Sequence, residues 1–125
     1  VDAQGELKVV AVDMAIDCGP QINPERIRAQ MEGGAVMGLS LALSGEISFD
    51  QGRVVQSNFF DFTVLRHAES PRTIRTHLVN NNHEVPPGGV GEPPVPPVAP
   101  ALFNAIFAAT GKRIRQLPLR DQLQA

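Results

Sequence analysis

The sequence predicts an α+β fold in which two main helices pack on a mixed or antiparallel sheet. Two segments, 23–45 and 98–111, carry apolar residues at three- and four-residue spacing, which is typical of amphipathic helices. Short runs rich in β-branched and aromatic residues lie around them and are typical of strands. The predicted order is strand, helix, hairpin, strand, loop, helix and strand, without an internal repeat or a domain boundary.

The composition narrows the classes of function. At 125 residues and 13.4 kDa, the chain is at most one ordinary domain or part of one. Its net charge of −2 is spread along the sequence, which gives no electrostatic reason to bind nucleic acid. No apolar run approaches the roughly 18 residues that span a bilayer. The sequence begins at Val1 and not at a methionine, so we expect a processed product or a piece of a longer chain.

Cysteine and histidine usage indicates no metal site built by the chain itself. Cys18 is the one cysteine, and the three histidines are scattered without the spacing of zinc ligands. We expect Cys18 to be a small buried hydrophobic residue.

The N-terminal part predicts a strand and then a long helix. The nearly continuous apolar run 7–19 suits a buried strand that ends in a turn. Asn23 is a typical N-cap, Pro24 suits the first helical position, and Gly45 can end the helix in a left-handed conformation. The predicted apolar stripe consists of Ile27, Met31, Ala35, Leu39 and Ala42.

Three glycines inside this helix are unusual. Gly33, Gly34 and Gly38 each cost roughly 1 kcal/mol relative to alanine in a helix interior. We therefore expect another segment or a ligand to lie close to that face of the helix.

The rest of the chain predicts a hairpin, a strand, a second helix and a last strand. Residues 46–64 alternate around the turn at 50–53, which predicts a hairpin with a longer second arm. Residues 73–79 alternate as a further strand, and the polar residues 80–84 suit an exposed loop. Residues 113–119 suit a short final strand. We expect Phe59, Phe60 and Phe62 to belong to the core, and the second helix to present Ala99, Leu102, Phe103, Ile106 and Phe107 and to end at Gly111.

The stretch VPPGGVGEPPVPPVAPA (85–101) places one carboxylate, Glu92, between a glycine cluster and a run of prolines. Glycines allow close approach of a bulky partner, and prolines are expected to hold the following chain extended. A carboxylate fixed in such a crowded, largely apolar loop can serve as a general base. Two other interpretations are a proline-rich turn with an exposed glutamate and a polyproline ligand for an SH3-like or WW-like partner.

Two motifs resemble one known family. Residues 88–119, which begin GGVGEPP, and residues 17–43, which contain QMEGG, resemble the C-terminal part of the molybdenum-binding large subunit of the xanthine dehydrogenase and aldehyde oxidase family. The most similar branch is that of the isoquinoline 1-oxidoreductase beta subunit. The resemblance extends from about Val9 to Leu119 and implies that residues 1–125 are a C-terminal segment of a larger molybdopterin-binding domain.

The resemblance also implies roles for individual residues. Gly89, Val90, Gly91 and Glu92 match the family's Gly-x-Gly-Glu motif, in which the glutamate is the general base beside the molybdenum. Gln30 matches the glutamine of the Gln-x-Glu-Gly motif, which contacts the cofactor near the metal. The glycines that follow Gln30 would leave room for the pterin or for neighbouring backbone.

The family's chemistry implies the reaction and the partners. Its members are molybdenum-dependent oxidoreductases that oxidise an N-heterocycle or an aldehyde with oxygen derived from water. Their molybdopterin often has the cytosine dinucleotide form in bacteria. Electrons leave through 2Fe–2S clusters on a small iron–sulfur subunit, which a chain with one cysteine cannot bind.

The remainder of such a large subunit would supply the other walls of the site. We therefore expect the isolated chain to bind no molybdopterin, to be inactive, and to self-associate through apolar surface that the remainder would cover. The alternative is a stand-alone, noncatalytic interaction module derived from this fold.

Overall fold

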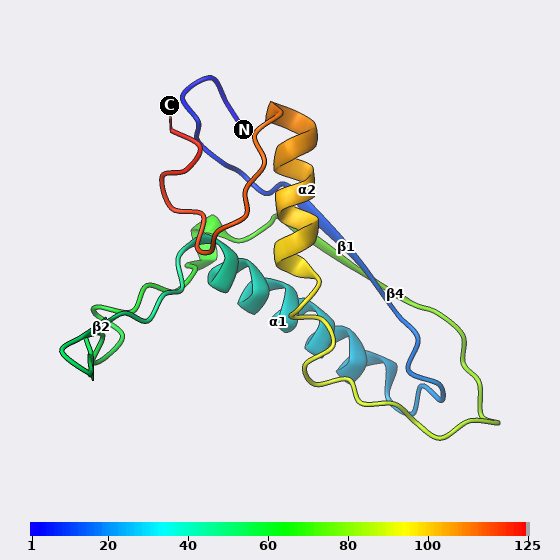
Figure 1. Ribbon diagram of the computed structural model, residues 1–125. Coiled ribbons are helices and arrows are strands. Elements are labelled where there is room, and N and C mark those ends of the chain that lie inside the picture. Colours follow the sequence, from blue (N-terminus) through cyan, green and yellow to red (C-terminus); the bar gives the residue numbers. More distant parts are fainter. Residues whose placement is uncertain (125) are drawn as a thin grey trace.

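The computed structural model describes residues 1–124 (Figure 1). Its two helices and small sheets confirm the predicted α+β class. The strands form two separate pairs in place of one sheet: β1 and β4 are parallel, and β2 and β3 are antiparallel. The elements are β1 (Ala11–Ile16), α1 (Pro24–Leu43), β2 (Phe49–Asp50), β3 (Arg53–Val54), β4 (Thr73–Leu78) and α2 (Val98–Thr110), with a short 3-10 helix at His67–Glu69.

β1 and β4 lie side by side, and α1 belongs to the connection between them (Figure 1). A parallel pair needs such a crossover connection. The register pairs Ala11 with Thr73 and continues to Ile16 with Leu78. Met14 and Ile16 are buried in the core, whereas alternate residues of β1 are exposed. The first strand is therefore buried on one face only, which corrects the expectation from its apolar run.

α1 begins as predicted. The side chain of Asn23 accepts a hydrogen bond from the N–H of Arg26 at 3.1 Å, and Pro24 occupies the first turn. The whole predicted stripe from Ile27 to Ala42 is buried. The predicted end at Gly45 is wrong, because Ser44 caps the helix with φ −143°.

The C-terminal segment satisfies the last carbonyl groups of α1. The N–H of Leu119 donates to the carbonyl of Ala42 at 2.8 Å, and the N–H of Arg120 donates to the carbonyl of Leu43 at 3.1 Å. These bonds replace the predicted left-handed glycine. Residues 113–119 form no strand, so the predicted short final strand is wrong.

α2 packs on α1 through one face (Figure 1). Leu102, Phe103 and Ile106 are buried as predicted, and Gly111 ends the helix with φ 74°. Phe107 departs from the predicted stripe because its side chain is 40% exposed. The guanidinium of Arg113 lies 3.7 Å from the centre of its ring.

Residues 46–62, the arm, project away from the two helices (Figure 1). The turn is confirmed at Gln51 and Gly52, which both have positive φ. The predicted long second arm is wrong, because the side chain of Asp61 accepts hydrogen bonds from the N–H groups of Ser57 and Asn58 and closes a turn there. These hydrogen bonds lower the pKa of Asp61.

The aromatic residues of the arm are not core. Phe59 is 76% exposed and Phe60 is 85% exposed, while Phe62 is partly buried. Their alternation reflects a turn and not a strand, so the predicted core role is wrong. Residues 80–84 are exposed, as predicted. Within residues 1–124, no helix has both the length and the hydropathy to cross a bilayer.

Candidate functional site

The segment 85–97, the glutamate loop, belongs to the connection between β4 and α2 and is attached to the body on both sides of Glu92. The N–H of Gly88 donates to the carbonyl of Cys18 at 2.9 Å, just after β1. Pro94 is almost completely buried, and its ring lies against Gly34 of α1. The loop passes around the N-terminal half of α1 before it enters α2 (Figure 1). Glu92 lies between the two attachments.

The start of the loop is held by the turn that follows β1. The side-chain amide of Asn80 donates to the carboxylate of Asp17 at 2.8 Å, and the N–H of Gln21 donates to the side chain of Asn81 at 2.8 Å. The bond from Asn80, with one from the N–H of Gly19, lowers the pKa of Asp17. Asparagines predicted only as surface loop therefore connect β4 to β1.

The prolines form turns and not an extended segment. The N–H of Val95 donates to the carbonyl of Glu92 at 2.9 Å, and the N–H of Val98 donates to the carbonyl of Val95 at 3.3 Å. Pro97 has helical dihedral angles. The predicted extended form is wrong because these turns direct the chain into α2, and a polyproline ligand would need the extended form.

The predicted close approach to the glycine-bearing helix is confirmed at two positions. A methyl group at Gly34 would overlap the ring of Pro94, and one at Gly38 would come within 2.7 Å of the side chain of Val98. A methyl group at Gly33, Gly89 or Gly91 would meet no atom within 4 Å. Packing within the described chain therefore accounts for two of these five glycines and leaves three with open space beside them.

Both predicted polar site residues are exposed. Gln30 lies on α1 one turn before Gly34, and its side-chain amide forms no hydrogen bond with the described residues. The side chain of Glu92 forms no hydrogen bond or ion pair within residues 1–124. Val90 is partly buried against the core. The expected crowded, apolar surroundings of Glu92 are thus wrong for this chain, because the backbone on either side of it is attached while its side chain faces outward.

The fold nevertheless brings the two predicted motifs together. Pro94 follows Glu92 by two residues and rests on Gly34, which belongs to the QMEGG motif with Gln30. Residues distant in sequence therefore meet at one turn of α1. The amide of Gln30 and the carboxylate of Glu92 thus belong to two segments that touch at Gly34 and Pro94.

Comparison with known proteins decides the family. Residues 1–71, more than half of the chain, match the family model of the molybdopterin cofactor-binding domain. This chain belongs to the molybdopterin cofactor-binding domain family. The resemblance drawn from the two motifs is thereby confirmed.

Two curated proteins that are similar in sequence to this chain are much longer than it. The isoquinoline 1-oxidoreductase beta subunit of Brevundimonas diminuta is 36% identical over 121 residues, which cover 97% of this chain and 15% of the relative. One subunit of the nicotinate dehydrogenase of Pseudomonas putida is 36% identical over 115 residues, which cover 92% of this chain and 10% of the relative. The chain thus spans at most 15% of the length of these two relatives.

Solved structures of similar proteins agree with the fold. A crystal structure of the Cu,Mo-CO dehydrogenase in the carbon monoxide reduced state has a TM-score of 0.71 at 30% identity and covers 88% of this chain and 15% of that one. Quinoline 2-oxidoreductase from Pseudomonas putida 86 has a TM-score of 0.75 at 24% identity, which shows the fold alone.

The residues present fit a molybdopterin cofactor through neutral groups. Gly89 and Gly91 have no internal packing reason to be glycine, as is expected where a bulky group approaches the backbone. Gln30 has a free amide that can donate or accept a hydrogen bond.

Within residues 1–124, no cluster of three or more histidine, cysteine, aspartate or glutamate side chains is arranged to hold a metal ion. Cys18 is buried with 5% exposure, as predicted.

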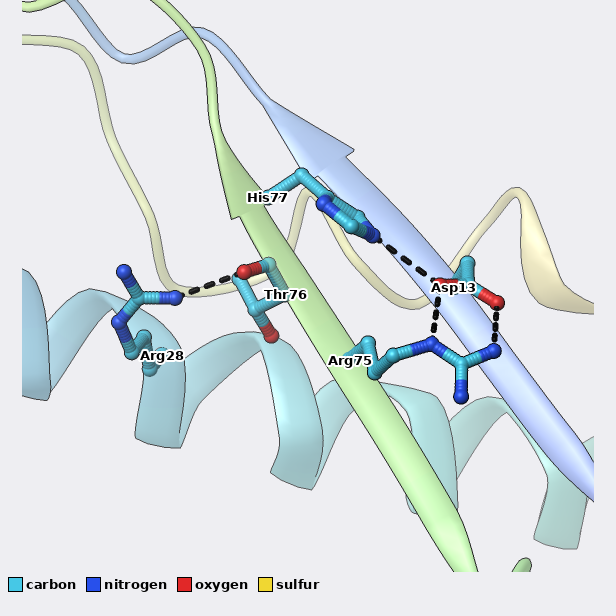
Figure 2. Close-up of polar contacts among 5 residues, drawn as sticks. All are labelled: Asp13, Arg28, Arg75, Thr76 and His77. Carbon is cyan, nitrogen blue, oxygen red and sulfur yellow. Dashed lines mark hydrogen bonds and ion pairs between the residues drawn. The ribbon is translucent and has the colours of Figure 1, made fainter.

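A charged cluster on the molybdopterin-domain sheet was missed in the sequence (Figure 2). The Nε and Nη2 atoms of Arg75 donate to the two carboxylate oxygens of Asp13 at 2.7 and 2.5 Å, and the Nε2 atom of His77 lies 3.0 Å from Oδ1 of Asp13. Arg75 and then His77 hold the pKa of Asp13 far below its ordinary value. Asp13 in turn raises the pKa of Arg75.

This cluster joins the strands on the exposed face of the sheet. On the other side of β4, Nη1 of Arg28 donates to the carbonyl of Thr76 at 2.7 Å and connects α1 to the strand (Figure 2). No local pattern could have revealed the pair of Asp13 and Arg75, because 62 residues separate them.

Proposed function

We propose that this chain forms part of the molybdenum site of a molybdenum hydroxylase that oxidises an N-heterocycle or an aldehyde with oxygen derived from water. Glu92 is the general base, and Gln30, Gly89, Val90 and Gly91 contact the cofactor. The observation that carries the proposal is the meeting of the Gln30 and Glu92 motifs at one turn of α1, with open glycine backbone beside them. Membership of the molybdopterin cofactor-binding domain family supports it.

Each residue has a separate task. The cofactor, when bound, supplies the two-electron redox chemistry and activates the oxygen derived from water. The Gln30 amide orients the cofactor by donating to an oxygen, and the backbone of residues 89–91 allows close approach. A carboxylate oxygen of Glu92 takes the proton that the water-derived oxygen loses before it attacks an electron-poor carbon.

The wider assembly follows the same proposal. Residues 1–125 form the C-terminal segment of a larger molybdopterin-binding domain, and the remainder of the large subunit supplies the other cofactor contacts. The cofactor has the cytosine dinucleotide form, and a small iron–sulfur subunit with 2Fe–2S clusters receives the electrons. The exposure of Gln30 and Glu92 supports this view, because a general base needs surrounding walls that exclude bulk water. The isolated chain is accordingly inactive and holds no molybdopterin.

The test of the base is Glu92→Gln in the native polypeptide that carries this sequence. The substitution keeps the size of the side chain but removes its ability to accept the proton. We expect kcat to fall by about 10²–10⁴-fold, while molybdenum content measured by mass spectrometry is unchanged. Glu84→Gln is the matched control, because Glu84 lies a short distance upstream in the sequence, is exposed, and keeps its backbone bond to Asn82. Wild-type turnover in the Glu92→Gln enzyme would exclude the role.

The test of the cofactor contact is Gln30→Ala. We expect lower molybdenum content in the purified enzyme, because one donor to the cofactor is lost. Gln4→Ala removes an exposed amide near the N-terminus, which lies far from the start of α1 in Figure 1, and serves as control. Full molybdenum occupancy with an unchanged visible absorption spectrum in Gln30→Ala would contradict the contact.

A second candidate function, a noncatalytic interaction module, is favoured by the exposed apolar side chains of the arm, including Phe59 and Phe60. The intact mass of the native polypeptide separates the two. A mass several times 13.4 kDa is expected for the molybdenum enzyme. A mass near 13.4 kDa would favour the interaction module, or a site completed by another chain.

A further inference from the structure

Gly34 is the point of α1 on which the glutamate loop rests. A methyl group there would overlap both Cβ and Cγ of Pro94, whose side chain is among the most completely buried of the described residues. One helical turn later, a methyl group at Gly38 would come within 2.7 Å of Val98 at the start of α2. These two glycines together allow the loop and α2 to approach the helix backbone.

The contact at Gly34 reaches Glu92 through a short, constrained piece of chain. The N–H of Val95 donates to the carbonyl of Glu92 at 2.9 Å and closes a turn that contains Pro94. The proline ring fixes φ inside this turn, so little rotation is available to absorb a displacement. A shift of the Pro94 ring must therefore move the backbone of Glu92 as well.

The side chain of Glu92 has no other support within the described chain. Its carboxylate forms no hydrogen bond or ion pair with residues 1–124, and the neighbouring Gly91 has open space beside it. The attachment of Gly88 to Cys18 fixes the loop four residues earlier. Val90, two residues before Glu92, is only partly buried against the core, whereas Pro94, two residues after it, is almost completely buried on α1 and is the tighter of the two packed contacts beside Glu92.

We infer that Gly34 is a positioning residue for Glu92: its missing side chain lets Pro94 seat on α1 and so sets the place of the general base relative to Gln30. The inference rests on the proposed function of Glu92. The two adjacent glycines of the QMEGG motif therefore have different roles, because Gly34 contacts Pro94 of the glutamate loop whereas Gly33 has open space beside it.

A double-mutant cycle in the native polypeptide tests this role. The variants are Gly34→Ala, Pro94→Gly and the double variant, with Gly33→Ala as the matched control for adding a methyl group to the same helix. The first readout is hydrogen–deuterium exchange of peptides that cover residues 88–98, which does not depend on turnover. The second is the pH dependence of kcat/KM, which reports the ionisation of the essential base in the free enzyme.

For Gly34→Ala, we expect faster exchange in the loop and a fall in kcat/KM of up to about 100-fold, the scale of a misplaced catalytic group. We also expect a displaced acid limb of the pH profile and unchanged molybdenum content. In the Pro94→Gly background, the added methyl group should cause no further loss, because the ring that it would displace is gone. Gly33→Ala should leave exchange of the loop at the wild-type rate.

Three results would overturn the inference. In the first, Gly34→Ala matches Gly33→Ala in loop exchange and in pH profile. In the second, Gly34→Ala lowers kcat/KM by the same factor in the Pro94→Gly background as in the wild type. If Gly34→Ala does not accumulate as folded protein, Pro94→Gly alone carries the test, and wild-type loop exchange in that variant would overturn the role. Wild-type turnover in Glu92→Gln would instead defeat the proposed function, which keeps the two failures distinct.

Discussion

Asp13 on β1 accepts two hydrogen bonds from the guanidinium group of Arg75, its register partner on β4. This bidentate contact lies on the exposed face of the only pair of long strands in residues 1–124. Because the strands are parallel and far apart in sequence, the contact helps to fix their register.

The pair should make the strands sensitive to acid. The pKa of Asp13 is lowered from its ordinary value of 3.8, so its stabilising contribution is complete above that pH and is lost as the pH falls towards the lower folded-state pKa. The raised pKa of Arg75 affects only strongly alkaline conditions. We expect Asp13→Asn to speed hydrogen exchange of β4 relative to wild type above about pH 4, with a difference that shrinks in more acidic solution.

The control for this prediction is Asp50→Asn, since Asp50 is exposed and its side chain makes no hydrogen bond or ion pair with the described residues. Equal exchange of β4 in Asp13→Asn and wild type at about pH 6 would show that the bidentate contact does not hold the strands.

The N-cap of α1 should stabilise the helix end measurably. Asn23→Ala removes the acceptor for the N–H of Arg26 and is expected to cost about 1 kcal/mol. Exchange of the amides in the first turn of α1 should become faster. Asn23→Ser keeps an acceptor and should retain most of the protection, and equal protection in both variants would contradict the capping role.

The interface of the two helices should depend on Leu39. This side chain is only 2% exposed and belongs to the core that α1 and α2 share. Leu39→Ala should lower the free energy of unfolding by about 2–5 kcal/mol, because it leaves a cavity. Met37→Ala, at a side chain with 58% exposure on the same helix, is the control. Urea unfolding with the same midpoint in both variants would argue against this core.

The arm should drive self-association of the isolated 125-residue chain. Phe59 and Phe60 are the most exposed large apolar side chains of the arm, and association would bury them. Replacing both by serine should weaken association by at least about tenfold, as measured by sedimentation. Leu117→Ser changes an exposed leucine outside the arm and should have a smaller effect. A monomeric wild-type chain at high concentration would refute the prediction.

The parts of the fold that the sequence predicted well depend on local signals. Asn23 and Pro24 define the start of α1, and Gly111 defines the end of α2, because caps involve residues within one turn. The alternation at Phe60 and Phe62 was misleading, since a turn held by Asp61 produces the same pattern. The parallel pairing of β1 and β4 depends on contacts that no local window contains.

In the candidate site too, features with a local sequence signal were predicted, and contacts between distant segments were not. Gln30 and Glu92 are predicted as site residues because each belongs to a short motif. The contact of Gly34 with Pro94 was only partly foreseen, because the glycines indicated a close neighbour without naming it. The prolines were predicted as extended, although the turn bonds at Val95 and Val98 and the burial of Pro94 give them a compact form.

The capping of α1 by Leu119 and Arg120 has a bearing on how the chain folds during synthesis. A ribosome releases α1 long before these residues, so the carbonyls of Ala42 and Leu43 must remain solvated until the C-terminal segment arrives. The pairing of β1 with β4 likewise waits for a late segment, and closing such long loops slows folding. A chain cut before Pro118 would therefore leave the last carbonyl groups of α1 without the backbone donors of Leu119 and Arg120.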